Sequence, residues 1–215
     1  MFKPNSKVVF FGAHTDDEMI CAGTLHRLVR EGHTVDVVTF AQAATVNDRA
    51  GSGNSMDVDD EWHRSMDLIG VSARRLYSAY ISPSADFQPH RQRIAQLIYD
   101  YCEAEKPDVV FTLSPDDENT AHHIVGVESE RVLRGRVPTV VRCQFPWNYS
   151  IGRPNLFVRL DQPDWECKLA VIDAYKSQHF RYRYREMLSA YCLADGLSVK
   201  SLLPCEKFEI IRDVR

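Results

Sequence analysis

One imidazole and three carboxylates directly follow the first apolar stretch of the chain. Residues 7–13 are mostly β-branched and aromatic, and they are followed by His14, Asp16, Asp17 and Glu18. Histidine and carboxylate side chains are ligands that zinc takes in proteins. His14 and Asp17, three residues apart at the start of a helix, could bind one metal ion and leave Asp16 beside it as a general base.

The same residues have a second interpretation that involves no metal. The three acids could be first-turn residues that complement a helix dipole, and His14 could be a hydrogen-bonding residue at a strand end. Neighbouring carboxylates repel one another, so folding them together favours a nearby cation or a helix amino terminus. This segment alone leaves both interpretations open.

The segments around these residues have the pattern of a strand, a helix and a second strand. Residues 19–32 have apolar residues at helical spacing and end at Gly32, and residues 34–41 are another β-branched run. This order predicts parallel strands and an α/β fold. Ligands of parallel α/β sheets bind outside the carboxyl ends of the strands, which is where the polar residues would lie.

A second polar segment follows another apolar run, residues 108–113, and precedes a helical pattern at 124–133. It contains acids, an asparagine and two adjacent histidines: Asp116, Asp117, Asn119, His122 and His123. Because both polar segments would lie at the same edge of a parallel sheet, a histidine from the second could complete a catalytic zinc site with one position open to water. The acids and the asparagine could instead be helix-capping and turn residues.

The rest of the chain predicts more helices and strands of the same kind of fold. We expect helices at 60–70, from about 90 to 106 and at 164–175, and strands at 75–80, 139–145, 156–160 and 205–212. Residues 42–57 lack periodicity, which indicates either a mobile loop over the site or a plain surface loop. With no repeat or linker, residues 1–215 predict one domain.

Composition and charge exclude several classes of protein. A net charge of -4 argues against a dedicated nucleic-acid binder, and the short aromatic and arginine run at 180–185 is more typical of a helix surface. No apolar run reaches the roughly 18 residues of a membrane span, and no secretory signal is evident, so we expect a cytoplasmic protein. The six cysteines are scattered without a Cys-x-x-Cys pair, which predicts free, mostly buried thiols.

Taken together, the two polar segments resemble motifs of the LmbE-like/PIG-L family of zinc-dependent N-acetylglucosaminyl de-N-acetylases. Residues 13–18, Ala-His-Thr-Asp-Asp-Glu, are similar to the family's Ala-His-Pro-Asp-Asp-Glu, with threonine in place of proline. Residues 117–123, Asp-Glu-Asn-Thr-Ala-His-His, are similar to Asp-x-Asn-x-Asp-His-Arg in one branch of the family. Similar tracts at 23–25, 176–178 and 206–209 extend the resemblance over nearly the whole chain.

The resemblance implies a Rossmann-like three-layer α/β fold with a mostly parallel central sheet and the site at the carboxyl ends of the strands. It implies a single LmbE-like deacetylase domain. It also implies one Zn²⁺ per chain, with His14, Asp17 and His122 as its ligands, and Asp16 as the general base. The register of the second motif selects His122 rather than His123.

The chain differs from the family at two places in the second motif. Asn119 stands where many members have a histidine that stabilises the oxyanion or protonates the leaving group, and an asparagine can donate a hydrogen bond but not a proton. Asp16 would then act as base and acid, unless His123 or His179 reaches the site. Ala121 stands where an acid usually precedes the histidine ligand, so we expect that histidine to lack a customary partner.

The expected activity is that of a metal-dependent amidohydrolase acting on a linear amide. It would remove the N-acetyl group from a small-molecule substrate, an N-acetylated amino sugar or sugar conjugate. One alternative is a metal-dependent phosphoesterase using Mg²⁺ or Mn²⁺, which two histidines and a single metal site disfavour. Another is a catalytically impaired relative that retains zinc and binds a glycan or a partner protein.

Overall fold

The structure is a computed structural model that describes residues 2–43, 55–77, 86–148, 153–179 and 183–214. Its centre is a seven-stranded sheet with the strand order β3-β2-β1-β4-β5-β7-β6. The strands are β1 (Lys7–His14), β2 (Thr34–Ala41), β3 (Ala73–Leu76), β4 (Val109–Leu113), β5 (Thr139–Cys143), β6 (Leu156–Arg159) and β7 (Cys205–Asp213). Strands β1 to β5 are parallel to one another, and β7 is antiparallel to both β5 and β6.

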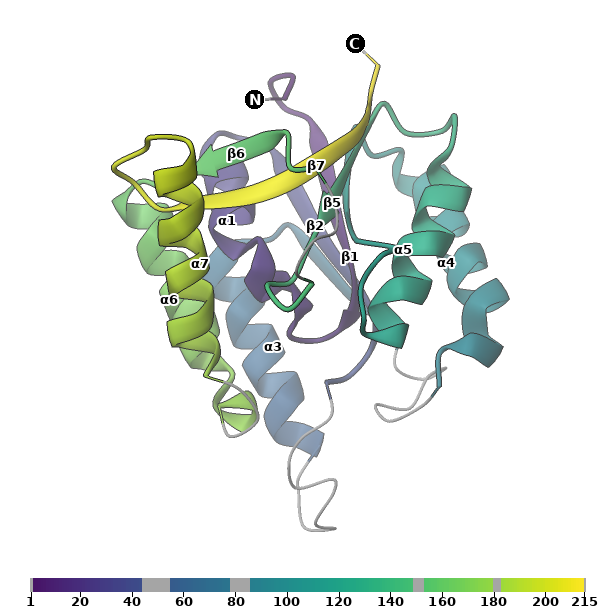
Figure 1. Cartoon of the computed structure of the whole chain (residues 1–215). Coiled ribbons are helices and arrows are strands. Elements are labelled where there is room, and N and C mark those ends of the chain that lie inside the picture. The colour runs from purple at the N-terminus through teal and green to yellow at the C-terminus, as the bar shows by residue number, and fades with distance from the viewer. Residues whose placement is uncertain (1, 44–54, 78–85, 149–152, 180–182, 215) are drawn as a thin grey trace.

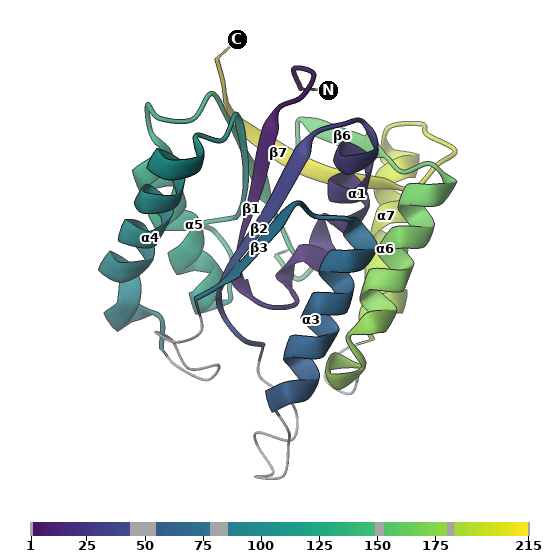
Figure 2. The same ribbon diagram turned by 180° about the vertical axis from the view of Figure 1, so that it is seen from behind.

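Helices cover both faces of this sheet (Figures 1 and 2). Helices α4 (Arg91–Glu105) and α5 (Thr120–Leu133) pack together on one face. The other face carries α1 (Ala22–Arg30), α3 (Ser55–Ile69), α6 (Gln162–Ala174) and α7 (Tyr184–Ser198). Short 3₁₀ helices are η1 (Asp17–Ile20), η2 (Gln88–His90) and η3 (Lys176–Gln178). The predicted three-layer α/β fold with a mostly parallel sheet is therefore confirmed.

The central strands are apolar on both faces because helices cover both. Residues 8–13 of β1 and all five residues of β4 are buried. Phe10 pairs in register with Phe111 of β4 on one side and with Val37 of β2 on the other. Such two-sided burial explains why these strands appear in the sequence as continuous β-branched and aromatic runs rather than as alternating patterns.

Most predicted elements are present, with differences at their ends. The helix predicted at 19–32 is divided into η1 and α1 by Cys21, whose φ of -125° and ψ of 13° are not helical. The third strand is Ala73–Leu76 rather than 75–80, of which 78–80 lie outside the described residues. Helix α3 begins at Ser55, so the last part of the loop predicted at 42–57 is helical, and 44–54 lie outside the described residues.

Two further predictions concern the cysteines and membrane insertion. All six cysteines are buried free thiols, as predicted. Within the part of the chain that the structure describes, no helix is both long and apolar enough to cross a bilayer. The aromatic and arginine run at 180–185 is described only from residue 183, and its last two residues open α7.

Candidate functional site

Two neighbouring strand ends bring the predicted metal ligands together. Strand β1 ends at His14 and continues into η1, which begins at Asp17, while the adjacent parallel strand β4 leads to α5, which carries His122. One ligand atom from each of these three residues lies within 4.8 Å of the other two. The Nε2 atom of His122 is 3.0 Å from Oδ1 of Asp17. The Nδ1 atom of His14 is 3.9 Å from the same oxygen.

The backbone of the β1 end holds Asp17 in this orientation. Its Oδ2 atom accepts hydrogen bonds from the N–H groups of Ala13, at 2.7 Å, and His14, at 2.8 Å. Burial on its own would raise the pKa of Asp17, but His122 and His14 outweigh it and hold the pKa well below its usual range. Asp17 is therefore a charged carboxylate with one oxygen anchored to the chain and the other directed at two imidazoles.

His122 has a carboxylate partner on its second ring nitrogen. Its Nδ1 atom is 3.0 Å from Oδ2 of Asp117, a buried side chain that also accepts a hydrogen bond from the backbone N–H of Asn119. Burial favours a lower pKa for His122, but Asp17 and Asp117 outweigh it and raise the pKa to about 10. The expectation that this histidine lacks a partner is therefore wrong, because its second ring nitrogen bonds to the carboxylate of Asp117.

Asn119 is the N-cap of α5. Its Oδ1 atom accepts hydrogen bonds from the backbone N–H groups of Ala121, at 2.9 Å, and His122, at 3.5 Å. The cap explains why α5 begins at Thr120, four residues before the helix predicted at 124–133. The carbonyl oxygen of Asn119 is thus used by the helix, and the amide nitrogen lies on an exposed side chain.

The other two acids of the first motif are also buried. Asp16 is 8% exposed and Glu18 is 0% exposed, so neither is a solvated first-turn acid. Glu18 accepts hydrogen bonds from the hydroxyls of Ser65, at 2.6 Å, and Tyr175. Burial raises the pKa of Glu18 to about 8 in spite of these two hydrogen bonds, and the nearby Asp16 adds to the increase. Glu18 is therefore uncharged at neutral pH, which removes part of the repulsion expected among the three acids.

The two histidines considered as alternative acids have other contacts. His123 is exposed, and its Nδ1 atom bonds to the carbonyl oxygen of Pro115. The Nε2 atom of His179 is 3.2 Å from the carbonyl oxygen of Ile172 in α6. Among the described residues, the group able to hold a metal contains neither of them.

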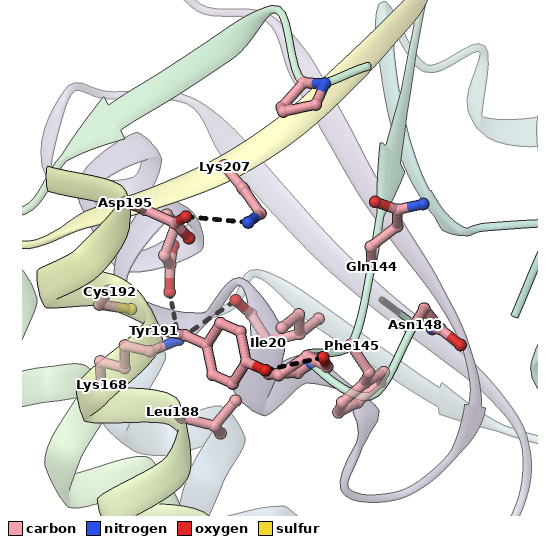
Figure 3. A pocket seen from close by; sticks show the side chains of 13 residues that line it. Ile20, Gln144, Phe145, Asn148, Lys168, Leu188, Tyr191, Cys192, Asp195 and Lys207 are labelled. Atoms are coloured by element: carbon pink, nitrogen blue, oxygen red, sulfur yellow. Dashed lines mark hydrogen bonds and ion pairs between the residues drawn. The ribbon is translucent and has the colours of Figure 1, made fainter. Parts of the chain in front are cut away.

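Aromatic rings that the sequence did not single out surround the two imidazoles. The ring of Phe145 lies 5.1 Å from that of His122 and is stacked at 4.4 Å on Trp147. Phe87 lies 5.5 Å from His14 on the other side. Phe145 also lines a cavity of about 340 Å³ that is bounded by α7 and β7 (Figure 3). The indole N–H of Trp147 donates to Oδ1 of Asp117, at 3.4 Å, so the stacked rings of Phe145 and Trp147 contact the carboxylate that binds His122.

The donor set fits a metal ion of the zinc type. Two imidazole nitrogens and one carboxylate oxygen are the ligands of many catalytic zinc sites, which retain a further position for water or substrate. The second nitrogen of His122 bonds to a carboxylate, as is usual for metal-binding histidines. His14 is half-buried whereas Asp17 and His122 are buried, so the cluster is open on the His14 side.

Comparison with solved structures shows the same fold in proteins of different activity. The N,N'-diacetylchitobiose deacetylase of Pyrococcus horikoshii is 21% identical, with a TM-score of 0.74, over 96% of this chain and 84% of that chain. The zinc-inhibited form of teicoplanin deacetylase Orf2 is 13% identical, with a TM-score of 0.77, over 97% and 99%. The 4-carboxy-2-hydroxymuconate hydratase GalB of Pseudomonas putida KT2440 is 14% identical, with a TM-score of 0.76, over 96% of each chain.

Comparison of sequences identifies the family. No match was found among curated proteins. The family described as PIG-L, GlcNAc-PI de-N-acetylase, matches residues 9–132, which is more than half of the 215 residues and includes both polar segments. The chain therefore belongs to the PIG-L/LmbE-like family.

Proposed function

We propose that the protein is a metal-dependent hydrolase that removes the N-acetyl group from an N-acetylated amino sugar or sugar conjugate. The observation that carries the proposal is the convergence of His14, Asp17 and His122 at two strand ends, with Asp16 next to them in the chain. Membership of a de-N-acetylase family supports the reaction. The fold shared with a chitobiose deacetylase supports a sugar as the substrate.

In this proposal His14, Asp17 and His122 hold one Zn²⁺ per chain. A bound zinc ion supplies a Lewis acid and lowers the pKa of a coordinated water. Asp16 accepts the proton of the attacking water and later returns it to the departing amine, because His123 and His179 bond elsewhere. Because Glu18 is neutral, it places no second negative charge beside Asp16.

Two further assignments complete the proposal. The exposed amide N–H of Asn119 donates to the acetamide oxygen, while its carbonyl oxygen remains bonded to the start of α5. Residues 1–215 form a single LmbE-like deacetylase domain that acts in the cytoplasm on a small molecule and has no nucleic-acid partner. The continuous seven-stranded sheet supports a single domain, and the net charge of -4 argues against a nucleic-acid partner.

The alternatives have less support. A phosphoesterase site would favour oxygen ligands, whereas two of the three ligands here are imidazoles. Ala121 and Asn119 are the residues that favour a catalytically impaired relative. His122 nevertheless has a carboxylate partner in Asp117, and the amide nitrogen of Asn119 lies on an exposed side chain. A hydratase shares the fold, so the fold alone does not identify the reaction. Acetate release must therefore be measured directly.

The test measures metal content and acetate release on the same preparations. Wild type is loaded in turn with zinc, manganese and magnesium and assayed on N-acetylglucosamine and N,N'-diacetylchitobiose. We expect Asp16→Asn to retain the metal and to lose about 100-fold or more in kcat, since a general base contributes that much. We expect His14→Ala and His122→Ala to lose the metal itself. Equal metal loss in all three variants, or full activity after chelation, would refute the proposed roles.

A further inference from the structure

A fully buried lysine holds the turn that carries the first motif. Lys168 lies in α6 and has no exposed surface. Its Nζ atom donates to the carbonyl oxygens of Met19, at 2.8 Å, and Ile20, at 3.1 Å, which are the last two residues of η1. Figure 3 shows the bond to Ile20. The Nζ atom also bonds to Oε1 of Glu206 at 2.6 Å. The ammonium group thus has three oxygen partners inside the protein.

Glu206 extends this contact to the start of the next helix. It lies on β7 and is 3% exposed. Its Oε2 atom accepts a hydrogen bond from the backbone N–H of Thr24 at 2.7 Å, and its Oε1 atom accepts one from Gly23 at 3.2 Å. The two side chains together bind the carbonyl end of η1 and the amide end of α1, on either side of the break at Cys21.

Stability alone does not explain a pair of this kind. Removing two charges from water costs several kcal/mol for each ion, and apolar residues of similar volume are often as stabilising. A buried pair that ties three distant segments does, however, fix their relative positions. Here those segments are η1 with the start of α1, helix α6 and strand β7, which are separated by up to 183 residues in sequence.

The turn at η1 needs such a support because it is short. It has four residues, and only Thr15 and Asp16 separate it from the end of β1. Two backbone bonds within it join Met19 to Asp16, at 3.3 Å, and Cys21 to Glu18, at 3.0 Å. The opposing ligand His122 is carried by α5, which lies on the face of the sheet opposite to α1 and α6 (Figure 1). A shift of η1 therefore changes the distance between ligands that come from two separate layers.

We infer that Lys168 and Glu206 are positioning residues that set the place of Asp16 and Asp17 relative to His122. They do so through the backbone of η1 and the start of α1, to which their hydrogen bonds run. The inference predicts an effect on metal affinity whether or not the proposed deacetylation is correct. The effect on turnover rests on the proposed function, because a displacement of about 1 Å at reacting groups can cost roughly 100-fold in rate.

The test separates positioning from stability with a charge-balanced double variant. Lys168→Met leaves Glu206 buried without its cation, and we expect a lower Tm and a metal affinity reduced about tenfold or more. In Lys168→Met with Glu206→Gln, no charge is left unpaired and the glutamine oxygen can still accept from Thr24. We expect the Tm to recover and the metal affinity and kcat to remain low, with KM changed much less.

Lys207→Met is the matched control. Lys207 follows Glu206 on β7 and pairs with Asp195 at 2.9 Å, away from η1 (Figure 3). We expect its metal affinity and kcat to equal those of wild type. Wild-type metal affinity in the double variant, or an equal loss in the control, overturns the inference. Should neither Lys168 variant fold, Glu206→Met alone is measured, because methionine has no oxygen to accept from Gly23, Thr24 or Lys168. An unchanged metal affinity in that variant overturns the inference as well.

Discussion

Asp16, Asp17 and Glu18 are consecutive acids with three different environments. Asp17 is charged because two imidazoles face one of its oxygens and backbone N–H groups bind the other. Full burial raises the pKa of Glu18 to about 8, so its protonated form predominates at neutral pH. The repulsion expected from three adjacent carboxylates is thus reduced by neutralising one and pairing another. In the proposed function, Asp16 is the acid that transfers the proton.

The first prediction concerns Asp117, which orients His122. Asp117→Asn keeps the size of the side chain but removes the charge that favours the Nδ1–H tautomer, the form in which Nε2 is free to bind metal. We expect metal affinity to fall about 10- to 100-fold with little change in fold. Isothermal titration of the metal-free protein with zinc measures this loss.

Asp116→Asn is the control for that experiment, because Asp116 is the neighbouring acid and is exposed. It should bind zinc as wild type does. If Asp117→Asn also binds zinc with wild-type affinity, the carboxylate of Asp117 does not orient His122. The acid that is absent at Ala121 would then have no substitute. Equal losses in both variants would indicate a general effect of charge rather than of the hydrogen bond.

The motif residues could be predicted from the sequence, but most of their supports could not. His14, Asp17 and His122 follow strands whose patterns are clear, and parallel strands place their carboxyl ends together. The hydroxyl partners of Glu18 are 47 and 157 residues away from it, at Ser65 and Tyr175. Such contacts depend on how α3 and η3 pack against η1, which no local pattern encodes.

The elements differ in how clearly their sequences predict them. Strand β2 has its predicted bounds, 34–41, because it is a mostly β-branched run that lies between the polar residues His33 and Gln42. Helix α7 was not predicted, because its buried residues form a narrow stripe four positions apart, at Tyr184, Leu188, Cys192 and Gly196. A stripe containing a glycine and preceded by an aromatic and arginine run has no clear helical signal.

The second prediction concerns Thr15, which joins the ends of two strands. Its buried Oγ1 atom accepts a hydrogen bond from the backbone N–H of Ala43, just after β2, at 2.9 Å. The family motif has proline at this position, which offers no hydroxyl. Thr15→Val preserves the shape but leaves that buried N–H unpaired, so we expect about 1–3 kcal/mol of lost stability. Chemical denaturation measures the free energy of unfolding.

Two other substitutions isolate the hydrogen bond. Thr15→Ser retains the hydroxyl and should be much closer to wild type than Thr15→Val is. Thr112 on β4 is equally buried, and its hydroxyl has no hydrogen-bond partner among the described residues. Thr112→Val should therefore be neutral or stabilising. Destabilisation of the same size at both positions would show that the contact with Ala43 contributes nothing of its own.

The site depends on the whole molecule rather than on the matched part alone. The family match ends at residue 132, and it includes all three candidate metal ligands. Three side chains that stabilise η1 by hydrogen bonds come after that point. Lys168 and Tyr175 bond to η1 directly, and Glu206 bonds to Lys168. The layer of α6 and α7 and the antiparallel strand β7 therefore support a site whose motifs lie in the first two thirds of the chain.

The third prediction follows from competition between a metal ion and a proton at His122. Without metal, the pKa of His122 is raised from 6.5 to about 10, so the folded protein holds a proton there at neutral pH. A folded-state pKa above the unfolded one stabilises the metal-free protein fully below pH 6.5. This stabilisation is lost as the pH rises towards 10. Metal must displace the same proton, so metal affinity should rise about tenfold per pH unit across this window.

This competition widens the gap in Tm between metal-loaded and metal-free protein as the pH rises. Thermal unfolding at pH 6, 7, 8 and 9, with the free zinc concentration held constant by a buffer, measures this gap, since bound ligand stabilises in proportion to the logarithm of its occupancy ratio. His123→Gln removes the exposed neighbouring imidazole and should leave the trend unchanged. A gap that is constant, or that widens towards acid pH, would mean that His122 carries no proton in the metal-free protein and that its two carboxylate neighbours do not hold it in the charged form.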